Sequence, residues 1–316
     1  MNIRSFIQKI TIACICCLLL LPGRGQSIEL YHCMVDLKGP QHGIMKKYGI
    51  QEAKLIDSRY FDPQKTGKID SAFFVRSLKE IFPSPNATGM GLLDLEDDNF
   101  AAMCMRPYAK VSFRTGLDEF IKLIRIAKWM RPQVRWSIYN IPYTSYWEKD
   151  DAWKGQGERL KELFDLVDVL TPAMYDFYPD TTKHNIDKIY IDDNMQLSLR
   201  LGEKLGKPVM PYIWQRWHEG NPREGLLLID EDEFKGHIRQ IMKNKYGKIS
   251  VAGLIWFDAQ SFFHYITPGL DKKDHKKVGG RIGLVKDTSL DTYARYILEA
   301  VDPSTVTGKA PKRKKR

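Results

Sequence analysis

Short apolar runs alternate with longer amphipathic stretches along most of the chain. Runs of this length predict strands, and apolar residues that recur three and four apart predict helices between them. The predicted strands cover Ile28–Val35, Lys54–Asp57, Gly91–Leu95, Val134–Asn140, Asp168–Tyr175, Pro208–Trp214 and Ala252–Phe257. The predicted helices cover Leu117–Met130, Arg159–Leu166, Met195–Leu205 and Glu231–Lys245.

Repeated strand-then-helix units indicate an α/β protein with parallel strands and right-handed crossovers. A closed barrel and an open doubly wound sheet both fit this alternation. The first strand lacks a following glycine-rich phosphate loop, which disfavours a nucleotide-binding open sheet. Polar and aromatic residues gather at the carboxyl ends of the predicted strands, where barrels place their active sites. We therefore predict a single TIM-like (β/α) barrel, either seven-stranded or distorted.

The length of 316 residues, with 43% hydrophobic and 11% aromatic residues, suits one such domain. Residues 1–26 combine basic Arg4 and Lys9, the apolar run Ile10–Leu21 and a small-residue exit, which predicts a signal peptide. The run is too short for a stable membrane span. We expect a secreted or periplasmic protein with a barrel domain over residues 27–303, in which Gln41–Gly67 and Asp271–Gly280 form loops.

The formal net charge of +10 is concentrated at the two ends of the chain. Three positive charges lie in the signal region and six in the tail that ends at Arg316, which leaves +1 on the rest. We predict a disordered basic tail over residues 304–316 and no nucleic-acid partner. The two cysteines outside the signal region, Cys33 and Cys104, form either one disulfide or two buried thiols.

Two carboxylates, Asp94 and Glu96, lie in Gly91-Leu-Leu-Asp-Leu-Glu96. Residues two apart on a strand point to the same face. Because two adjacent carboxyl groups cannot both ionise cheaply, one of them has a raised pKa and can act as a general acid. The alternative is that Glu96-Asp97-Asp98 begins a solvated acidic loop. The seven histidines show no paired spacing for a metal, and we expect neither a metal nor another cofactor.

Four segments resemble the hyaluronidase family of glycoside hydrolases. Ile81–Glu96 resembles the segment through that family's catalytic acid, and Trp136-Ser-Ile-Tyr-Asn-Ile-Pro-Tyr143 resembles its Trp-Gly-x-Tyr-Gly-x-Pro strand. Val169–Tyr175 and Gly253–Trp256 resemble two later strands, in the family's order. In addition, Met174-Tyr-Asp176 is similar to a chitinase motif.

This resemblance implies a retaining endo-glycosidase that acts, as a monomer, on a polysaccharide containing N-acetylhexosamine. Candidates are hyaluronan, chondroitin, chitin-like and peptidoglycan-type chains. It makes Glu96 the proton donor and Asp94 the residue that orients the substrate's 2-acetamido group, whose oxygen replaces a protein nucleophile. The implied sugar-binding residues are Tyr139, Tyr175, Trp256 as a stacking floor, Asp176, Trp214 and Asp258.

The sequence departs from the family at Asp97-Asp98, where aromatic and basic residues are usual, and at Asn140, where glycine is typical. Negative charge beside the cleft would disfavour an anionic polymer. Two alternatives remain at this point. One is a non-catalytic, lectin-like barrel, and the other is a glycosidase that uses a protein nucleophile such as Asp176.

Overall fold

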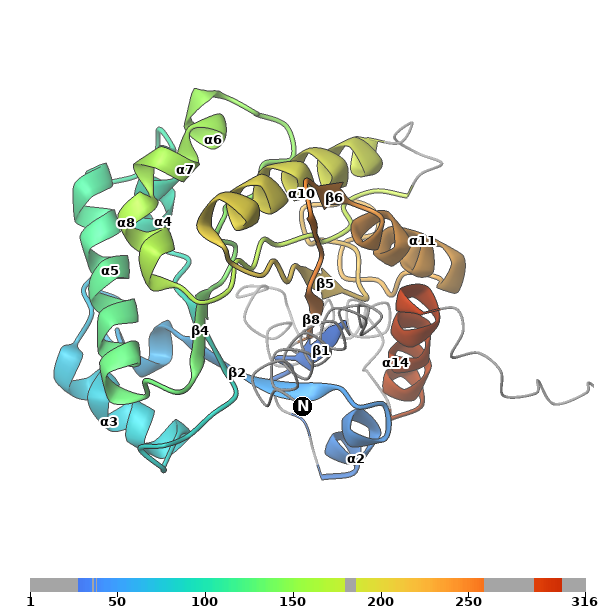
Figure 1. Cartoon of the computed structure of the whole chain (residues 1–316), viewed down its shortest axis with the longest axis horizontal. Helices are drawn as coiled ribbons and strands as arrows, with labels where there is room; N and C mark the ends of the chain where they lie inside the picture. Colours follow the sequence, from blue (N-terminus) through green and yellow to red (C-terminus); the bar gives the residue numbers. More distant parts are fainter. Residues whose placement is uncertain (1–27, 36, 38, 180–185, 259–286, 303–316) are drawn as a thin grey trace, which may run out of the picture.

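A computed structural model of the chain describes residues 28–35, 37, 39–179, 186–258 and 287–302. Strands lie at the centre and helices form a ring around them (Figure 1). The predicted signal peptide, the predicted basic tail and the predicted loop Asp271–Gly280 lie outside the described residues. No helix within the described ranges is long and apolar enough to cross a membrane.

Six parallel strands form one curved sheet in the order β4-β3-β2-β1-β8-β5. The predicted α/β barrel class is therefore confirmed. The strands are β1 (Glu29–His32), β2 (Gln51–Asp57), β3 (Met90–Asp94), β4 (Arg135–Ile138), β5 (Tyr212–Trp214) and β8 (Gly253–Phe257). A separate two-stranded hairpin consists of β6 (Lys245–Tyr246) and β7 (Ile249–Ser250).

The predicted strand Asp168–Tyr175 is present as an extended segment that joins the two edges of this sheet. On one side, the Asp168 backbone N–H donates to the Trp136 carbonyl of β4 over 2.8 Å. On the other side, isolated parallel bridges link Leu170 to Val209 and Ala173 to Tyr212. The barrel thus closes through a seventh, irregular segment.

Pro172 explains why this seventh segment is irregular. In a parallel ladder, alternate residues donate toward the same neighbour, and Leu170 and Met174 do so, to the Pro208 and Tyr212 carbonyls. The residue between them in this alternation is Pro172, which has no N–H to donate. The ladder is therefore reduced to separate bridges.

The helices pack outside the strands. Those that correspond to predicted helices are α5 (Phe113–Met130), α7 (Gln156–Arg159) with α8 (Lys161–Leu166), α10 (Ile186–Leu205) and α11 (Glu231–Met242). Those not predicted are α2 (Gly39–Lys47), α3 (Ser71–Ile81), α4 (Asp98–Met103), α6 (Asp151–Lys154), α14 (Asp287–Val301) and the 3-10 turn η1 (Ser58–Tyr60).

The prediction that Gln41–Gly67 is a loop is wrong, because the segment contains most of α2, all of β2 and η1. Helix α2 is glycine-rich and polar and buries only Gln41 and Met45. Strand β2 begins with the polar residues Gln51 and Glu52, which pair with β1. Both elements therefore lack the apolar period that marks the others.

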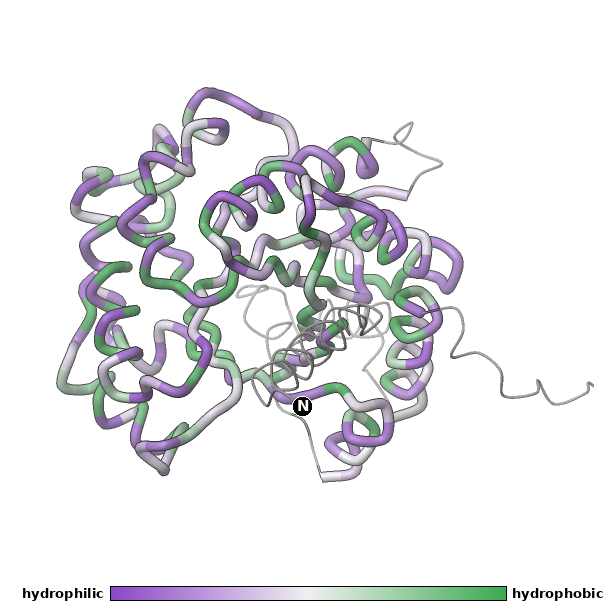
Figure 2. The backbone as a smooth tube through the Cα atoms, viewed as in Figure 1, coloured by the Kyte–Doolittle hydropathy of each residue, from purple (hydrophilic) through white to green (hydrophobic). Residues whose placement is uncertain are grey.

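The strands separate two apolar layers. One cluster fills the barrel interior and includes Leu92 and Ile255, while the other lies between strands and helices and includes Leu93 and Leu254. Along the outer helices, hydrophobic and hydrophilic positions alternate, as expected for helices with one covered side (Figure 2). Successive side chains along a strand point to opposite faces of the sheet, so residues alternate between the barrel interior and the helix layer.

The two cysteines are both buried and neither forms a disulfide. Cys33 belongs to the interior cluster, whereas Cys104 belongs to the outer one. Of the two alternatives from the sequence, the structure contains the buried thiols. The fold is held by its two apolar layers without a covalent link among the described residues.

Candidate active site

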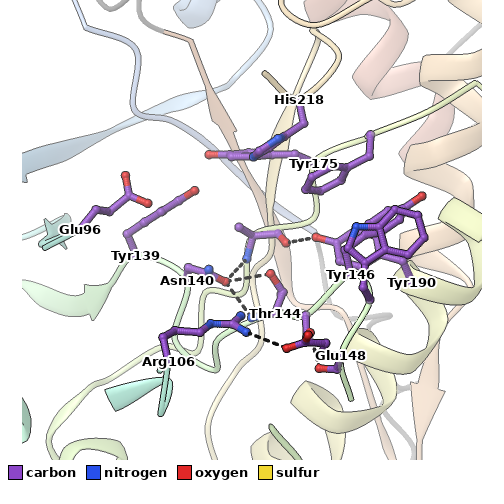
Figure 3. A pocket seen from close by; sticks show the side chains of 14 residues that line it. Glu96, Arg106, Tyr139, Asn140, Thr144, Tyr146, Glu148, Tyr175, Tyr190 and His218 are labelled. Atoms are coloured by element: carbon purple, nitrogen blue, oxygen red, sulfur yellow. Dashed lines mark hydrogen bonds and ion pairs between the residues drawn. The ribbon is translucent and has the colours of Figure 1, made fainter. Parts of the chain in front are cut away.

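Two adjoining cavities lie at the carboxyl ends of the strands. The larger has a volume of about 490 Å³ and the smaller about 340 Å³. Four residues line both: Glu96, Tyr139, Tyr175 and His218. We call the two cavities together the cleft. Figure 3 shows the smaller cavity, with these four side chains around it.

Strand β3 carries Asp94 and Glu96 into the cleft. Leu92 belongs to the interior cluster. Asp94 and Glu96 lie two and four residues later, so their side chains point to the same face of the sheet as Leu92. Both carboxyl groups line the larger cavity. Gly91, in the opposite phase, lies against the Trp136 ring, where an added Cβ would come within 2.3 Å of a ring carbon. This close contact lets β3 and β4 pack side by side beneath the acidic residues.

The environment of these two residues, which we call the acid pair, favours protonated carboxyl groups. Burial, followed by the neighbouring Glu96 and Asp57 charges, holds the pKa of Asp94 well above its usual range. Glu96 is exposed to the cleft, but neighbouring residues still remove much of the water around its carboxyl group. This desolvation, followed by the Glu219 charge, raises the pKa of Glu96 to about 7. A carboxyl group that titrates near neutral pH can both donate and accept a proton. The Asp94 Oδ1 atom is buried and has no hydrogen-bond partner among the described residues.

Three tyrosines surround the acid pair. Tyr139 and Tyr175, both predicted, line the two cavities, and their ring centroids lie 6.4 Å apart. Tyr212 lines the larger cavity, with its ring centroid 5.0 Å from that of Tyr139. Its buried hydroxyl also lacks a partner within the described part of the chain. Tyr212 was missed, although it lies two residues before the predicted Trp214 and thus shares its face.

Trp214 and Asp258 occupy different positions relative to the cleft. Trp214 lines the larger cavity, and its Nε1 donates to Asp258 Oδ1 over 3.0 Å. Asp258 is 3% exposed, lines neither cavity and also accepts from Gln215 Nε2 at 2.7 Å. The structure therefore places Asp258 behind Trp214, where it fixes the indole, and not at a sugar hydroxyl.

Trp256, the predicted stacking floor, lies outside the cleft. It is 1% exposed, belongs to the outer apolar cluster and donates from Nε1 to Gln215 Oε1 at 2.6 Å. Along β8, Ile255 and Phe257 point inward, so the intervening Trp256 must point to the helices. Phe257 lines the larger cavity in its place.

Asp176 also lies away from both cavities. It is 4% exposed, and its Oδ1 contacts His237 Nδ1 on α11. The other ring nitrogen of His237 is 2.6 Å from the Met174 carbonyl oxygen. This buried contact anchors the end of the seventh segment to α11. Asp176 lines neither cavity, which disfavours it as a nucleophile.

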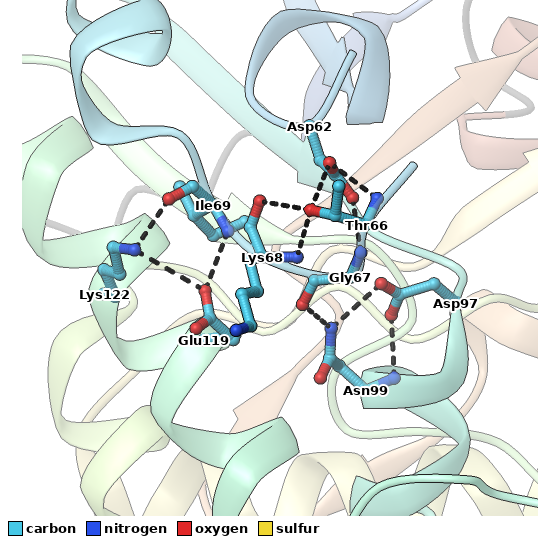
Figure 4. Close-up of polar contacts among 9 residues, drawn as sticks. All are labelled: Asp62, Thr66, Gly67, Lys68, Ile69, Asp97, Asn99, Glu119 and Lys122. Atoms are coloured by element: carbon cyan, nitrogen blue, oxygen red, sulfur yellow. Dashed lines mark hydrogen bonds and ion pairs between the residues drawn. The ribbon is translucent and has the colours of Figure 1, made fainter. Parts of the chain in front are cut away.

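Asp97 and Asp98, from which negative charge beside the cleft was predicted, do not line it. Asp97 caps α4, and its Oδ1 accepts from the Asn99 backbone N–H at 2.8 Å (Figure 4). Asp98 lies 3.8 Å from Lys110 Nζ at the surface. That prediction is therefore wrong about these two residues, because the chain turns into a helix immediately after Glu96.

His218 was missed by the sequence reasoning. The Gly220 backbone N–H donates to His218 Nδ1 at 2.9 Å, and the ring stacks on Phe177 at a centroid distance of 4.0 Å. Burial lowers the pKa of His218 to about 4. The ring is therefore neutral near pH 7 and, with Nδ1 accepting, carries its proton on Nε2. In the sequence, only the position of His218, shortly after the carboxyl end of the predicted strand Pro208–Trp214, indicates a site residue.

Asn140, which follows Tyr139, adopts an unusual backbone conformation. Its φ angle is 52°, in the left-handed region that favours glycine and that asparagine tolerates better than most residues. Its Oδ1 accepts from the backbone N–H groups of Thr144 and Ala173 at 3.1 and 3.2 Å. Asn140 thus fits the turn that follows Tyr139 and links it to the seventh segment.

No group of His, Cys, Asp and Glu side chains suited to hold a metal ion occurs in the described ranges.

The fold is similar to that of bee venom hyaluronidase. A monoclinic crystal structure of that protein, and its complex with a hyaluronic acid tetramer, each match with a TM-score of 0.58 at 14% sequence identity. The match covers 84% of this chain and 100% and 99% of the two bee venom chains. No protein-family model and no curated protein sequence matches this chain. Similarity at this identity establishes a common fold.

Proposed function

We propose that this protein is a retaining endo-glycoside hydrolase that cleaves polysaccharides containing N-acetylhexosamine. One observation carries the proposal: Asp94 and Tyr212, which line the cavity that also holds Glu96, each have a buried side-chain oxygen without a hydrogen-bond partner among the described residues. A buried polar group without a partner is costly, so its presence calls for an explanation, and a role in catalysis is one. An acetamido group offers an N–H to Asp94 and a carbonyl oxygen to Tyr212.

In the first step, Glu96 donates its proton to the glycosidic oxygen as the bond between that oxygen and the anomeric carbon breaks. The acetamide oxygen forms a bond to the anomeric carbon, giving an oxazolinium-type intermediate. When the substrate binds, Asp94 releases its proton to solvent, because the acetamide N–H then donates to its carboxylate and favours the ionised form. The ionised carboxylate stabilises the positive charge that develops on the acetamido group.

In the second step, Glu96, now ionised, accepts a proton from water. The water oxygen attacks the anomeric carbon, and the bond to the acetamide oxygen breaks. Because the anomeric carbon is attacked twice, its configuration is retained. Glu96 ends the cycle protonated, as it began, which suits a group that titrates near pH 7.

Other features support an extended carbohydrate substrate. The cleft continues on both sides of Glu96, and aromatic side chains occur in both cavities, among them Trp214 in the larger and Trp147 in the smaller. Aromatic faces stack on the apolar C–H face of a sugar ring. The fold similarity to bee venom hyaluronidase agrees with this function. The signal-like residues 1–26 further lead us to propose that the protein is exported.

The test is reducing-end release from a panel of acetamido glycans by the parent and by Glu96→Gln. The variant keeps the shape of the side chain but cannot donate the proton, so we expect a loss of about 10²–10⁴-fold in kcat. Equal rates for parent and variant would refute the role of Glu96. Binding by the parent without any release of ends would instead identify a lectin-like barrel.

A further inference from the structure

The charges that line the cleft bear on the kind of polymer it accepts, which is an inference that rests on the proposed function. Among the described lining residues, the acidic ones are Asp57, Asp94, Glu96, Glu148 and Glu219, and the basic ones are Arg59, Lys65 and Arg106. Without the acid pair, whose pKa values are raised, three acidic and three basic side chains remain, so the described lining has no excess of positive charge for a polyanion.

Both arginines are engaged by acids of the same lining. Arg59 Nη2 lies 2.6 Å from Asp57 Oδ2, and its Nε lies 2.9 Å from Asp57 Oδ1, a two-pronged ion pair. In the smaller cavity, Arg106 Nη1 lies 3.8 Å from Glu148 Oε2 (Figure 3). A guanidinium already paired in this way offers less to a substrate carboxylate, since the existing partner must be displaced.

His218, at the junction of the two cavities, does not add a positive charge. Its Nδ1 is occupied by the Gly220 N–H, so the neutral ring presents Nε2–H as an uncharged donor. No described residue bonds to Nε2. Apart from Lys65, whose side chain is exposed to solvent, the charged and donor groups of the described lining are thus paired arginines, neutral donors or carboxyl groups.

A polymer that alternates uronic acid with N-acetylhexosamine places a uronate directly beside each acetamido sugar. Its carboxylate would have to enter the cleft next to the acid pair whenever the neighbouring bond is cleaved. Moving a carboxylate out of water is strongly unfavourable unless a cation pairs with it, and the solvent-exposed Lys65 offers only a weak, screened attraction. The Glu219 carboxylate adds repulsion. An uncharged hexosamine chain meets neither cost.

We infer that the cleft selects uncharged N-acetylhexosamine polymers over uronate-containing ones. The selection resides in Glu148 and Glu219 and in the pairing of Arg59 and Arg106, not in Asp97 and Asp98 beyond β3. Glu148 acts by withholding Arg106 from the substrate.

The experiment compares non-sulfated chondroitin with its carboxyl-reduced form, in which only the uronate carboxylates are replaced by CH2OH. Affinities are measured with Glu96→Gln, so that binding is separated from turnover, and kcat/KM is measured with the parent. We expect the reduced polymer to bind and react at least about tenfold better at low salt. Added NaCl should narrow this gap, because it screens a repulsion.

A second arm uses Glu148→Gln, which releases Arg106. The ratio of kcat/KM for chondroitin to that for the reduced polymer should rise by about threefold, the size expected of one solvent-exposed charge. The matched control is the double variant Glu148→Gln with Arg106→Gln, which should restore the parent ratio.

Equal or tighter binding of native chondroitin, or a gap that widens with added salt, would overturn the inference. Preferential binding of the reduced polymer, with no hydrolysis of any acetamido glycan by the parent, would support the inference and refute the proposed function. Failure of both polymers to bind would overturn the inference.

Discussion

Strands β3 and β8 look alike in sequence and burial, yet they contribute differently to the cleft. Each has five residues, four buried and the last partly exposed. On β3, the inward phase ends in Asp94, whose Oδ1 has no partner among the described residues. On β8, Trp256 occupies the outward phase, and its Nε1 is bonded to Gln215. The comparison shows two differences between a group available to a ligand and a structural group. The available group points into the barrel and has an unsatisfied hydrogen-bonding atom, whereas the structural group points to the helices and is already bonded.

The largest effect that sharpens this comparison concerns Trp256. Trp256→Ala should lower the free energy of unfolding by about 3–5 kcal/mol, because it empties a fully enclosed site between β8 and the helices. The folded fraction should keep the KM of the parent. Urea denaturation and initial rates below the transition measure the two quantities.

The matched inward-facing variant is Phe257→Leu, which should raise KM instead, because Phe257 lines the larger cavity. If Trp256→Ala raised KM while leaving stability unchanged, Trp256 would be the stacking residue after all.

Asp94→Asn should reduce kcat on acetamido substrates by about 10²–10³-fold, because a neutral amide no longer stabilises the positive charge that forms in the first step. The variant is nearly isosteric and removes an ionisable group that the fold keeps protonated, so its urea midpoint should not fall. Steady-state rates and denaturation on the same preparation test both statements. A lower midpoint with an unchanged kcat would reverse the assignment of Asp94 from function to structure.

The pH dependence gives a smaller and graded effect. Because Glu96 must be protonated to act and its pKa is about 7, kcat/KM should fall about tenfold per pH unit above neutrality. Folding raises this pKa from 4.5, so the folded state binds the proton more tightly than the unfolded chain. Stability from this group is therefore complete below pH 4.5 and declines as the pH rises to about 7.

Glu96→Gln should remove that part of the pH dependence of urea denaturation. Parallel stability profiles for parent and variant between pH 4.5 and 7 would mean that the Glu96 pKa is not raised by folding.

Much of the fold follows from the sequence, because apolar period alone separates strands from helices. Some of the missed elements lack that period, such as α2 and the polar start of β2, whereas α3 has it and was missed all the same. The distortion of the seventh segment is encoded by Pro172, but its consequence depends on which neighbour Leu170 and Met174 bond to. That information is tertiary.

The site is predictable in part for a similar reason. Strand ends led to Asp94, Glu96, Tyr139, Tyr175 and Trp214, all of which line the cleft. Trp256 and Asp176 differ in placement because a strand end does not specify the face to which a side chain points. His218 and Glu219 were missed because they follow β5 on a connecting loop, whose path the local sequence does not determine.

The central claim is that the acid pair cleaves acetamido glycans with the substrate's own acetamide as nucleophile. It is tested most directly by comparing hydrolysis of one oligosaccharide in its N-acetylated form and after removal of the acetyl groups. We predict reducing-end release only from the acetylated form, and loss of that release in Glu96→Gln. Equal hydrolysis of the deacetylated form would contradict the account and indicate a protein nucleophile.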